Sequence, residues 1–140
     1  GLELEDHILA AQLKAPAPGL QNKLDEILTQ GSIEFESNTT TILPRVHTTL
    51  DQLIAVLRQA PHVTIEIGGH TDKYGAADYN LQLSQRRADA VRRYFTKHGL
   101  TNQFTAVGYG ATRPLSVAKT RAGLQQNRRI ELRIKGTSDL

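Results

Sequence analysis

The alternation of apolar and charged residues near the C-terminus constrains the fold of this chain more than any other sequence feature. Residues 129–135 read Arg-Ile-Glu-Leu-Arg-Ile-Lys, and residues 63–67 read Val-Thr-Ile-Glu-Ile. A strand covered by helices on both faces has a continuous apolar run instead. The pattern therefore predicts a sheet with helices on one face and solvent on the other.

The remaining elements follow from the spacing of apolar residues, because a period of two indicates a strand and spacings of three and four indicate a helix. Strands are expected near residues 33–35, 63–67, 104–108 and 130–134, and helices over residues 44–57 and 80–98. The sequence therefore predicts an α/β fold, a two-layer sandwich with a mixed four-stranded sheet, helices on one face, and the order βαβαββ.

The chain of 140 residues has room for one domain of about 150 residues. Residues 1–31 are expected to form a lead-in of two helical stretches, 2–13 and 20–30, joined by a Pro-rich linker. Residues 32–136 form the predicted domain, and residues 137–140 a tail. No apolar run approaches the ~20 residues of a membrane helix. A chain beginning Gly-Leu-Glu resembles an excised fragment, so we expect membrane association only through segments outside this chain.

Composition excludes several classes of site. The absence of cysteine excludes disulfide scaffolds, thiolate zinc sites and thiol nucleophiles. The five histidines are scattered without metal-ligand spacing, so we expect neither a metal nor a cofactor. A net charge of +3 is too small to indicate a partner by itself.

Arg87 is the clearest anomaly in the predicted helix over residues 80–98. It lies four residues from both Leu83 and Val91, on or beside the apolar stripe, where an unpaired charge would be costly. The preceding loop offers two carboxylates, Asp72 and Asp78, of which Asp78 could instead cap the helix. One interpretation is a structural salt bridge between Asp72 and Arg87. The other is a zwitterion site, in which the carboxylate takes an ammonium and the guanidinium takes a carboxylate.

The residues around this pair resemble the OmpA C-terminal-like peptidoglycan-binding family, which includes Pal-type lipoproteins and the periplasmic part of MotB-type stators. The resemblance runs from about Ser32 to Lys135. It rests on His70-Thr71-Asp72, Gly75, Asn80, Leu83-Ser84, Arg87-Ala88, Val91, Gly108-Tyr109-Gly110, Pro114 and Asn127-Arg128-Arg129-Ile130, together with Ile33, Phe35 and Ser37. One departure is Leu124 after Gly123, where members often carry arginine.

This resemblance implies non-catalytic binding of the diaminopimelate residue of the peptidoglycan stem peptide, in the periplasm or cell envelope. The partner would be peptidoglycan, and the oligomeric state is left open. Asp72 would supply the carboxylate and Arg87 the guanidinium, which would discriminate against lysine because lysine lacks the second carboxylate. The other residues that the resemblance assigns to the site are Asn80, Arg128, Glu36, Thr71 and Gly75.

The alternative function is nucleic-acid binding. The chain contains three pairs of adjacent arginines, at residues 86–87, 92–93 and 128–129, which would suit a phosphate-facing surface. Acidic residues are interspersed among them, and no nucleic-acid-binding motif is present. We therefore expect no nucleic-acid partner.

Overall fold

The computed structural model of the chain describes residues 19–137. The expected helical stretch over residues 2–13, most of the linker that follows it, and residues 138–140 of the expected tail lie outside the described residues. Thr137, the first residue of that tail, ends β3. In chain order the elements are α2 (Leu20–Gln30), the short 3₁₀ helix η1 (Pro44–Val46), α3 (His47–Arg58), β1 (Val63–His70), α4 (Ala77–Lys97), β2 (Phe104–Gly110), α5 (Arg121–Asn127) and β3 (Arg129–Thr137).

The three named strands form one mixed sheet in the order β2-β1-β3. β1 runs parallel to β2 and antiparallel to β3, which confirms the predicted mixed sheet. The predicted fourth strand is wrong. In the part of the chain that the structure describes, the segment around residues 33–35 makes only an isolated bridge, between Phe35 and Ile42.

Glutamine side chains occupy the outer edges of this sheet. The Gln21 amide of α2 donates to the carbonyl of Leu132 and accepts from the N–H of Ile134, both at 2.8 Å, on β3. The Gln85 amide of α4 bonds in the same way to Ala106 (2.8 Å) and Gly108 (2.9 Å) of β2. Each amide thus bonds to a backbone carbonyl and a backbone N–H that would otherwise pair with a further strand. The segment around residues 33–35 therefore meets no free edge at these positions.

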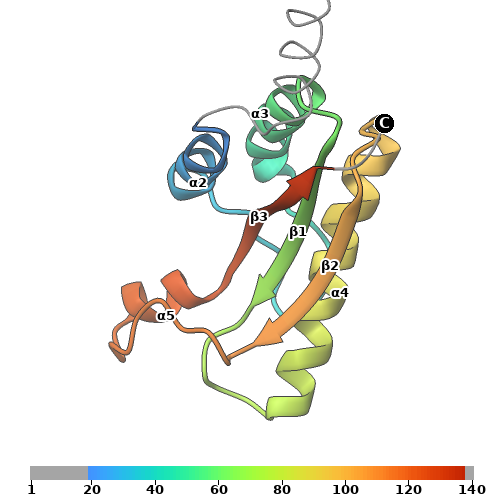
Figure 1. Cartoon of the computed structure of the whole chain (residues 1–140). Coiled ribbons are helices and arrows are strands. Elements are labelled where there is room, and N and C mark those ends of the chain that lie inside the picture. The colour runs from blue at the N-terminus through green and yellow to red at the C-terminus, as the bar shows by residue number, and fades with distance from the viewer. Residues whose placement is uncertain (1–18, 138–140) are drawn as a thin grey trace, which may run out of the picture.

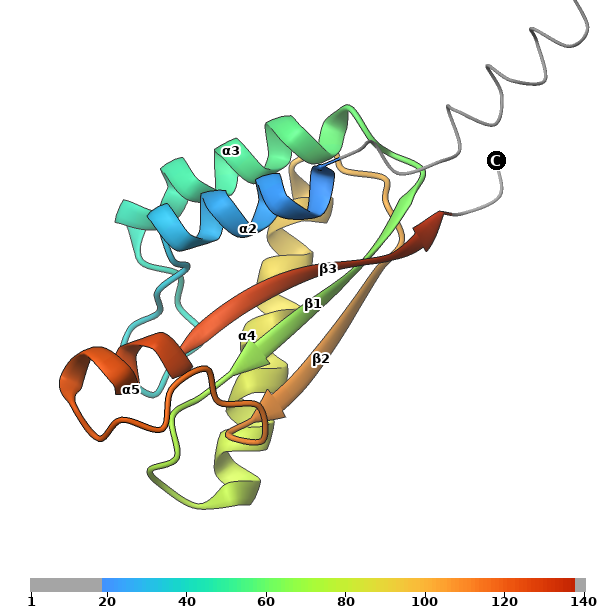
Figure 2. The same cartoon turned by 60° about the vertical axis from the view of Figure 1, so that its left-hand side comes forward.

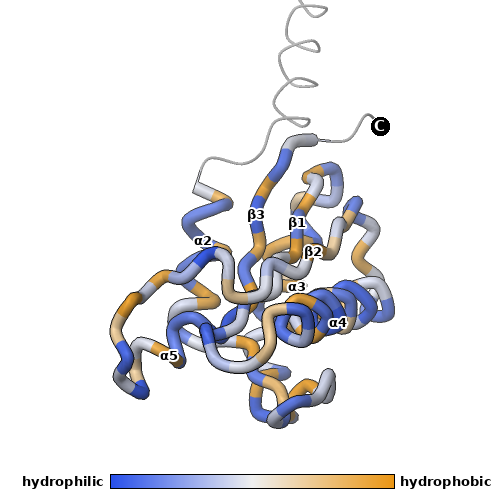
Figure 3. The backbone as a smooth tube through the Cα atoms, turned by 90° about the horizontal axis from the view of Figure 1, so that it is seen from below, coloured by the Kyte–Doolittle hydropathy of each residue, from blue (hydrophilic) through white to orange (hydrophobic). Residues whose placement is uncertain are grey.

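The helices lie on one face of the sheet, as predicted (Figures 1 and 2). Val63, Ile65 and Ile67 of β1 are fully buried in one core with apolar residues of α2, α3 and α4. Along β3, hydrophobic and hydrophilic residues alternate (Figure 3), so its polar side chains lie on the opposite face. The sandwich therefore has two layers, one of helices and one of sheet.

Glycines bring α4 into close contact with the sheet. A Cβ at Gly69 of β1 would lie 2.2 Å from the carbonyl oxygen of Ser84, and one at Gly108 of β2 would lie 2.4 Å from the backbone nitrogen of Gln85. Both positions face helix backbone, which cannot move aside as a flexible side chain can. Glycine at these two positions therefore sets the distance between the layers.

The helix expected over residues 20–30 is present as α2, and it packs into the same core as the rest of the domain. Leu24 is fully buried, and Gln21 holds the edge of β3. The predicted domain boundary at residue 31 would therefore separate α2 from the core to which it contributes. None of the helices in residues 19–137 is both long and apolar enough to cross a membrane.

The short helix α5 was not predicted. The Thr120 hydroxyl caps its N-terminus by accepting from the N–H of Gly123 (3.1 Å). The two residues that α5 buries are Gly123 and Asn127, so it has no apolar stripe that a sequence pattern would detect. This helix leads directly into β3 and brings Arg128 to the end of the sheet.

Candidate functional site

A cavity of about 440 Å³ lies at the end of the sheet where β1 ends and β3 begins. Its walls come from the segment around residues 33–38, the loop after β1, the first turns of α4, and the junction of α5 with β3. Among the predicted site residues, the cavity is lined by Thr71, Asp72, Gly75, Asn80, Arg87 and Arg128. The fold thus brings together residues that are up to 57 positions apart, whereas Glu36 does not line the cavity.

Arg87 reaches this cavity from the middle of α4. Its Nε donates to the carbonyl of Thr39 (2.9 Å) and its Nη2 to the carbonyl of Glu36 (3.2 Å), and its guanidinium carbon lies 4.9 Å from the centre of the Phe35 ring. No described carboxylate forms an ion pair with Arg87 within 4.0 Å. Burial lowers the pKa of Arg87, Tyr79 opposes this shift, and Arg128 adds to it. The carbonyls orient the guanidinium but leave its positive charge without a counterion.

Asp72 pairs with Arg128 instead of Arg87. Its Oδ2 lies 3.6 Å from Nη1 of Arg128, while its Oδ1 accepts from the backbone N–H of Tyr74 (2.9 Å). Arg128 is steadied by a second bond, from Nη2 to Oε1 of Gln125 (3.0 Å). The interpretation of Asp72 and Arg87 as a structural salt bridge is therefore not supported. The physical reason is that the turn before α3 holds Arg87, and the end of α5 supplies a different cation to Asp72.

Asn80 and Gly75 shape the loop that carries Asp72. The buried Asn80 side chain donates from Nδ2 to the carbonyl of Tyr74 (2.8 Å). Gly75 has a φ of 95°, a left-handed conformation in which side chains are strained. Thr71 is also buried, and its hydroxyl donates to the carbonyl of Asp72 (2.9 Å). The hydrogen bonds of these residues are made to the loop backbone, so their contribution is to hold the Asp72 carboxylate in place.

Asp78 does not cap α4. The helix begins at Ala77, its N-cap is Ala76 without a side-chain cap bond, and Asp78 lies in the first turn. A carboxylate in the first turn still interacts favourably with the helix dipole.

Glu36 contributes its backbone. Its side chain is exposed and does not line the cavity, but its carbonyl accepts from Arg87. Sequence reasoning missed Phe35, whose ring lies against the Arg87 guanidinium, as a member of the site. It also missed Asn38, which lines the cavity and has a φ of 58°. An asparagine inside the polar segment 37–41 was the available signal, because asparagine tolerates left-handed turns.

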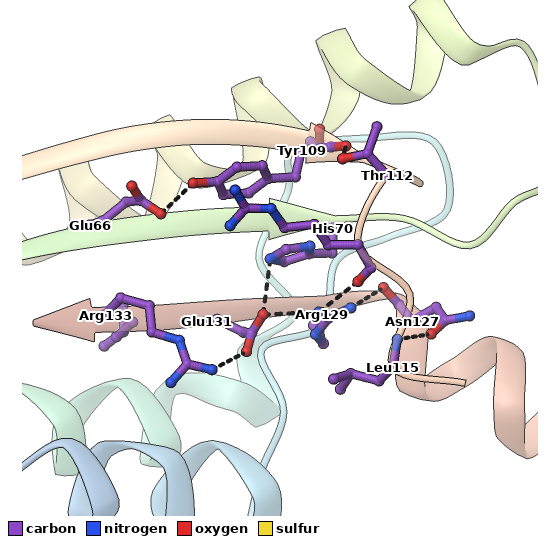
Figure 4. Close-up of polar contacts among 12 residues, drawn as sticks. Glu66, His70, Tyr109, Thr112, Leu115, Asn127, Arg129, Glu131 and Arg133 are labelled. Carbon is purple, nitrogen blue, oxygen red and sulfur yellow. Dashed lines mark hydrogen bonds and ion pairs between the residues drawn. The ribbon is translucent and has the colours of Figure 1, made fainter. Parts of the chain in front are cut away.

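A second polar cluster lies on the face of the sheet away from the helices (Figure 4), and two of its members, His70 and Arg129, also line the cavity. Nε2 of the buried His70 lies 3.0 Å from Oε2 of Glu131, and Arg129 and Arg133 bond to the same carboxylate at 2.9 Å. Its hydrogen bond with His70 is the main cause that lowers the pKa of Glu131 to about 2, with Arg129 adding to the shift and burial opposing it. This carboxylate is satisfied within the sheet.

Two carboxylates and three guanidinium groups line the cavity, but Glu34 pairs with Arg45, and Arg129 pairs with Glu131. Asp72, Arg87 and Arg128 therefore remain for a ligand. Asp72 is 15% exposed and its contact with Arg128 is long, so it can accept a further donor. Arg87 uses two of its N–H groups on carbonyls, which leaves the rest of its five donors for an anion. Among residues 19–137, no group of three or more His, Cys, Asp or Glu side chains could hold a metal ion.

Curated relatives match this chain over most of its length. The outer membrane porin F of Pseudomonas fluorescens is 36% identical over 104 residues, which cover 74% of this chain and 32% of the porin. The outer membrane protein A of Bordetella avium is 35% identical over 104 residues, covering 74% of this chain and 54% of that protein. The chain thus spans about a third to a half of these relatives. Both are outer membrane proteins, which places the chain in the cell envelope.

A solved structure and a family model agree with these relatives. The crystal structure of the peptidoglycan-associated lipoprotein from Burkholderia pseudomallei superposes with a TM-score of 0.68 at 32% identity, covering 81% of this chain and 97% of that one. The sequence model of the OmpA family matches residues 34–128, which include every predicted site residue. On its sequence, its fold and the residues gathered around the cavity, this chain belongs to the OmpA family.

Proposed function

We propose that this chain binds peptidoglycan without cleaving it, and so anchors an envelope protein to the cell wall. One observation carries the proposal: the partly buried Arg87 guanidinium, which has no carboxylate partner among residues 19–137, shares a cavity with the Asp72 carboxylate. Such a pair offers an acceptor for an ammonium and a planar fork of donors for a carboxylate. A ligand that carries both groups close together would satisfy both.

Diaminopimelate in a stem peptide is such a ligand, because its side chain ends in an ammonium and a carboxylate on the same carbon. In the proposed complex the ammonium binds Asp72, where it joins or displaces Arg128. The carboxylate takes the free donors of Arg87, with Arg128 on its other side. Lysine would offer the ammonium alone and would leave the guanidinium without an anion. The relative from Burkholderia pseudomallei, a peptidoglycan-associated lipoprotein by name, supports this ligand class.

The groups in the cavity favour binding over catalysis. Ser84 lines the cavity, but it is 1% exposed and its hydroxyl is engaged with backbone. It donates to the carbonyl of Leu81 and accepts from the N–H of Gly110, both at 2.9 Å. The nearby His70 directs Nε2 to Glu131. A serine without a base partner is not an activated nucleophile.

The arrangement of the arginines gives the nucleic-acid alternative little support. Arg87, Arg128 and Arg129 line the cavity, where Arg129 is already paired with Glu131. Arg92, elsewhere on α4, pairs with Asp89. The three arginine pairs are therefore not one phosphate-facing stripe.

Sedimentation with purified sacculi tests the proposal. We expect the chain to sediment with sacculi that contain diaminopimelate, to be displaced by a diaminopimelate stem peptide more readily than by its lysine counterpart, and to release no soluble muropeptides. The matched variants are Asp72→Asn, which removes the charge from the site, and Arg86→Ala, which removes an exposed arginine outside the cavity. A parent chain that stays in the supernatant would contradict the proposal, and release of muropeptides would contradict the absence of catalysis.

A further inference from the structure

The turn between residues 36 and 41 contains an unusual backbone conformation. Asn38 has a φ of 58° and is the one non-glycine residue with a positive φ in residues 19–137. Asparagine is tolerated there, whereas a β-branched residue is strongly disfavoured. The residue is exposed and lines the cavity beside Arg87.

Hydrogen bonds close this turn on itself. The N–H of Glu36 donates to the carbonyl of Thr41 (3.0 Å), and the N–H of Thr39 donates to the carbonyl of Glu36 (3.1 Å). The Thr39 hydroxyl donates to the same Glu36 carbonyl (2.9 Å) and accepts from the N–H of Thr41 (3.2 Å). The Asn38 side chain makes none of these bonds, so its contribution is the left-handed backbone that lets the turn close.

The same turn holds Arg87 through two carbonyls. The residues that accept from Arg87, Glu36 and Thr39, flank Asn38 on either side and lie 51 and 48 positions away from the arginine in sequence. No described carboxylate competes for the guanidinium within ion-pair distance. The direction in which Arg87 presents its remaining donors therefore depends on the shape of a turn outside its own helix.

We propose that Asn38 is a positioning residue for ligand recognition: its left-handed backbone sets the carbonyls that aim the Arg87 guanidinium, and thereby sets the preference for a ligand ammonium that is accompanied by a carboxylate. This inference rests on the function proposed above. Two N–H groups must bond to carbonyls of the turn while others meet the ligand carboxylate in the same plane, so a small distortion of the turn misaligns the fork. Recognition of the ammonium by Asp72 does not depend on the turn.

The test compares two peptides, identical except that one stem tripeptide ends in diaminopimelate and the other in lysine, by isothermal titration. Asn38→Val forces a β-branched residue into the left-handed conformation. We expect this variant to lose about tenfold or more in affinity for the diaminopimelate peptide, the effect of weakening a charge-assisted hydrogen bond, and to keep its affinity for the lysine peptide. Asn38→Gly, which adopts this conformation without strain, should retain the parent's preference. If Asn38→Val does not fold, Asn38→Ala gives the same comparison with less strain.

Two controls separate positioning from a loss of stability. Gly99→Val places the same residue at a φ of 90° after α4, away from the cavity, and should lower stability while keeping the ratio of the two affinities. In a double-mutant cycle, Asn38→Val should have no further effect on binding once Arg87→Ala is present, because its effect passes through Arg87.

The outcomes are distinct. A parent that binds both peptides equally overturns the proposed function and this inference with it. If the parent prefers the diaminopimelate peptide and a folded Asn38→Val variant keeps the same ratio of the two affinities, the inference alone is overturned. Additive effects of Asn38→Val and Arg87→Ala overturn it equally, because they would show that Asn38 acts without Arg87.

Discussion

Replacing Arg87 should separate ligand binding from stability. Arg87→Ala removes the guanidinium from a cavity in which the structure gives it no carboxylate partner. The ligand carboxylate would then keep only Arg128, which is 44% exposed. Loss of one partner from a partly buried charge pair costs about 2 to 5 kcal/mol, or roughly 30-fold to several thousandfold in affinity.

The effect of the same change on folding should be smaller. Arg87→Ala loses two hydrogen bonds to carbonyls, at 2.9 and 3.2 Å, of which one is exposed. It also removes the cost of holding a desolvated cation without a counterion, which partly offsets the loss. We therefore expect the free energy of unfolding to fall by about 1 to 2 kcal/mol. Arg87→Lys should bind with intermediate affinity, because an ammonium keeps the charge and lacks the planar fork.

Titration with a diaminopimelate stem peptide measures the binding, and urea unfolding measures the stability. Arg86→Ala is the matched control, since Arg86 is the exposed neighbour on α4 and does not line the cavity. Unchanged affinity in a folded Arg87→Ala variant would refute the reasoning. It would mean that Arg87 serves only to tie α4 to the turn at residues 36–41.

Three further predictions concern the scaffold. Gln85→Leu should free the outer edge of β2, lower the free energy of unfolding by about 2 kcal/mol and cause association that sedimentation detects. A variant as stable and monodisperse as the parent would show that Gln85 does not protect this edge. Gly69→Ala places a Cβ 2.2 Å from the backbone oxygen of Ser84 and should cost about 3 kcal/mol or more in urea unfolding, so a silent change would disprove the close contact. Because the pKa of Glu131 is lowered from 4.5 to about 2, the stability that its charged form contributes is complete above pH 4.5 and is lost as pH falls toward 2. Glu131→Gln should flatten the dependence of the free energy of unfolding on pH in this range, and an unchanged dependence would contradict this role of Glu131.

Much of the fold could be predicted because its signals are local. The alternation over residues 63–67 and 129–135 correctly indicated strands with helices on one face, and the helices at 44–57 and 80–98 correspond to η1 with α3 and to α4. The alternation at residues 33–35 was just as local, yet the strand that it predicted does not join the sheet. A ladder needs a partner with a free edge, and Gln21 and Gln85 occupy the edges of β3 and β2.

The candidate site likewise has features that local sequence signals determine and features that depend on the tertiary structure. The sequence alone determined which residues carry charge and which of them interrupt an apolar pattern, so Arg87 and Asp72 could be named from motif and spacing. Only the tertiary structure decided their partners. Arg87 lies among carbonyls contributed by a turn 48 positions earlier, and Asp72 faces Arg128 because the unpredicted α5 brings that residue to the end of the sheet. Periodicity reports the burial of a side chain within its own element, whereas a charge chooses its counterion by distance across elements, which is set only when the layers have packed.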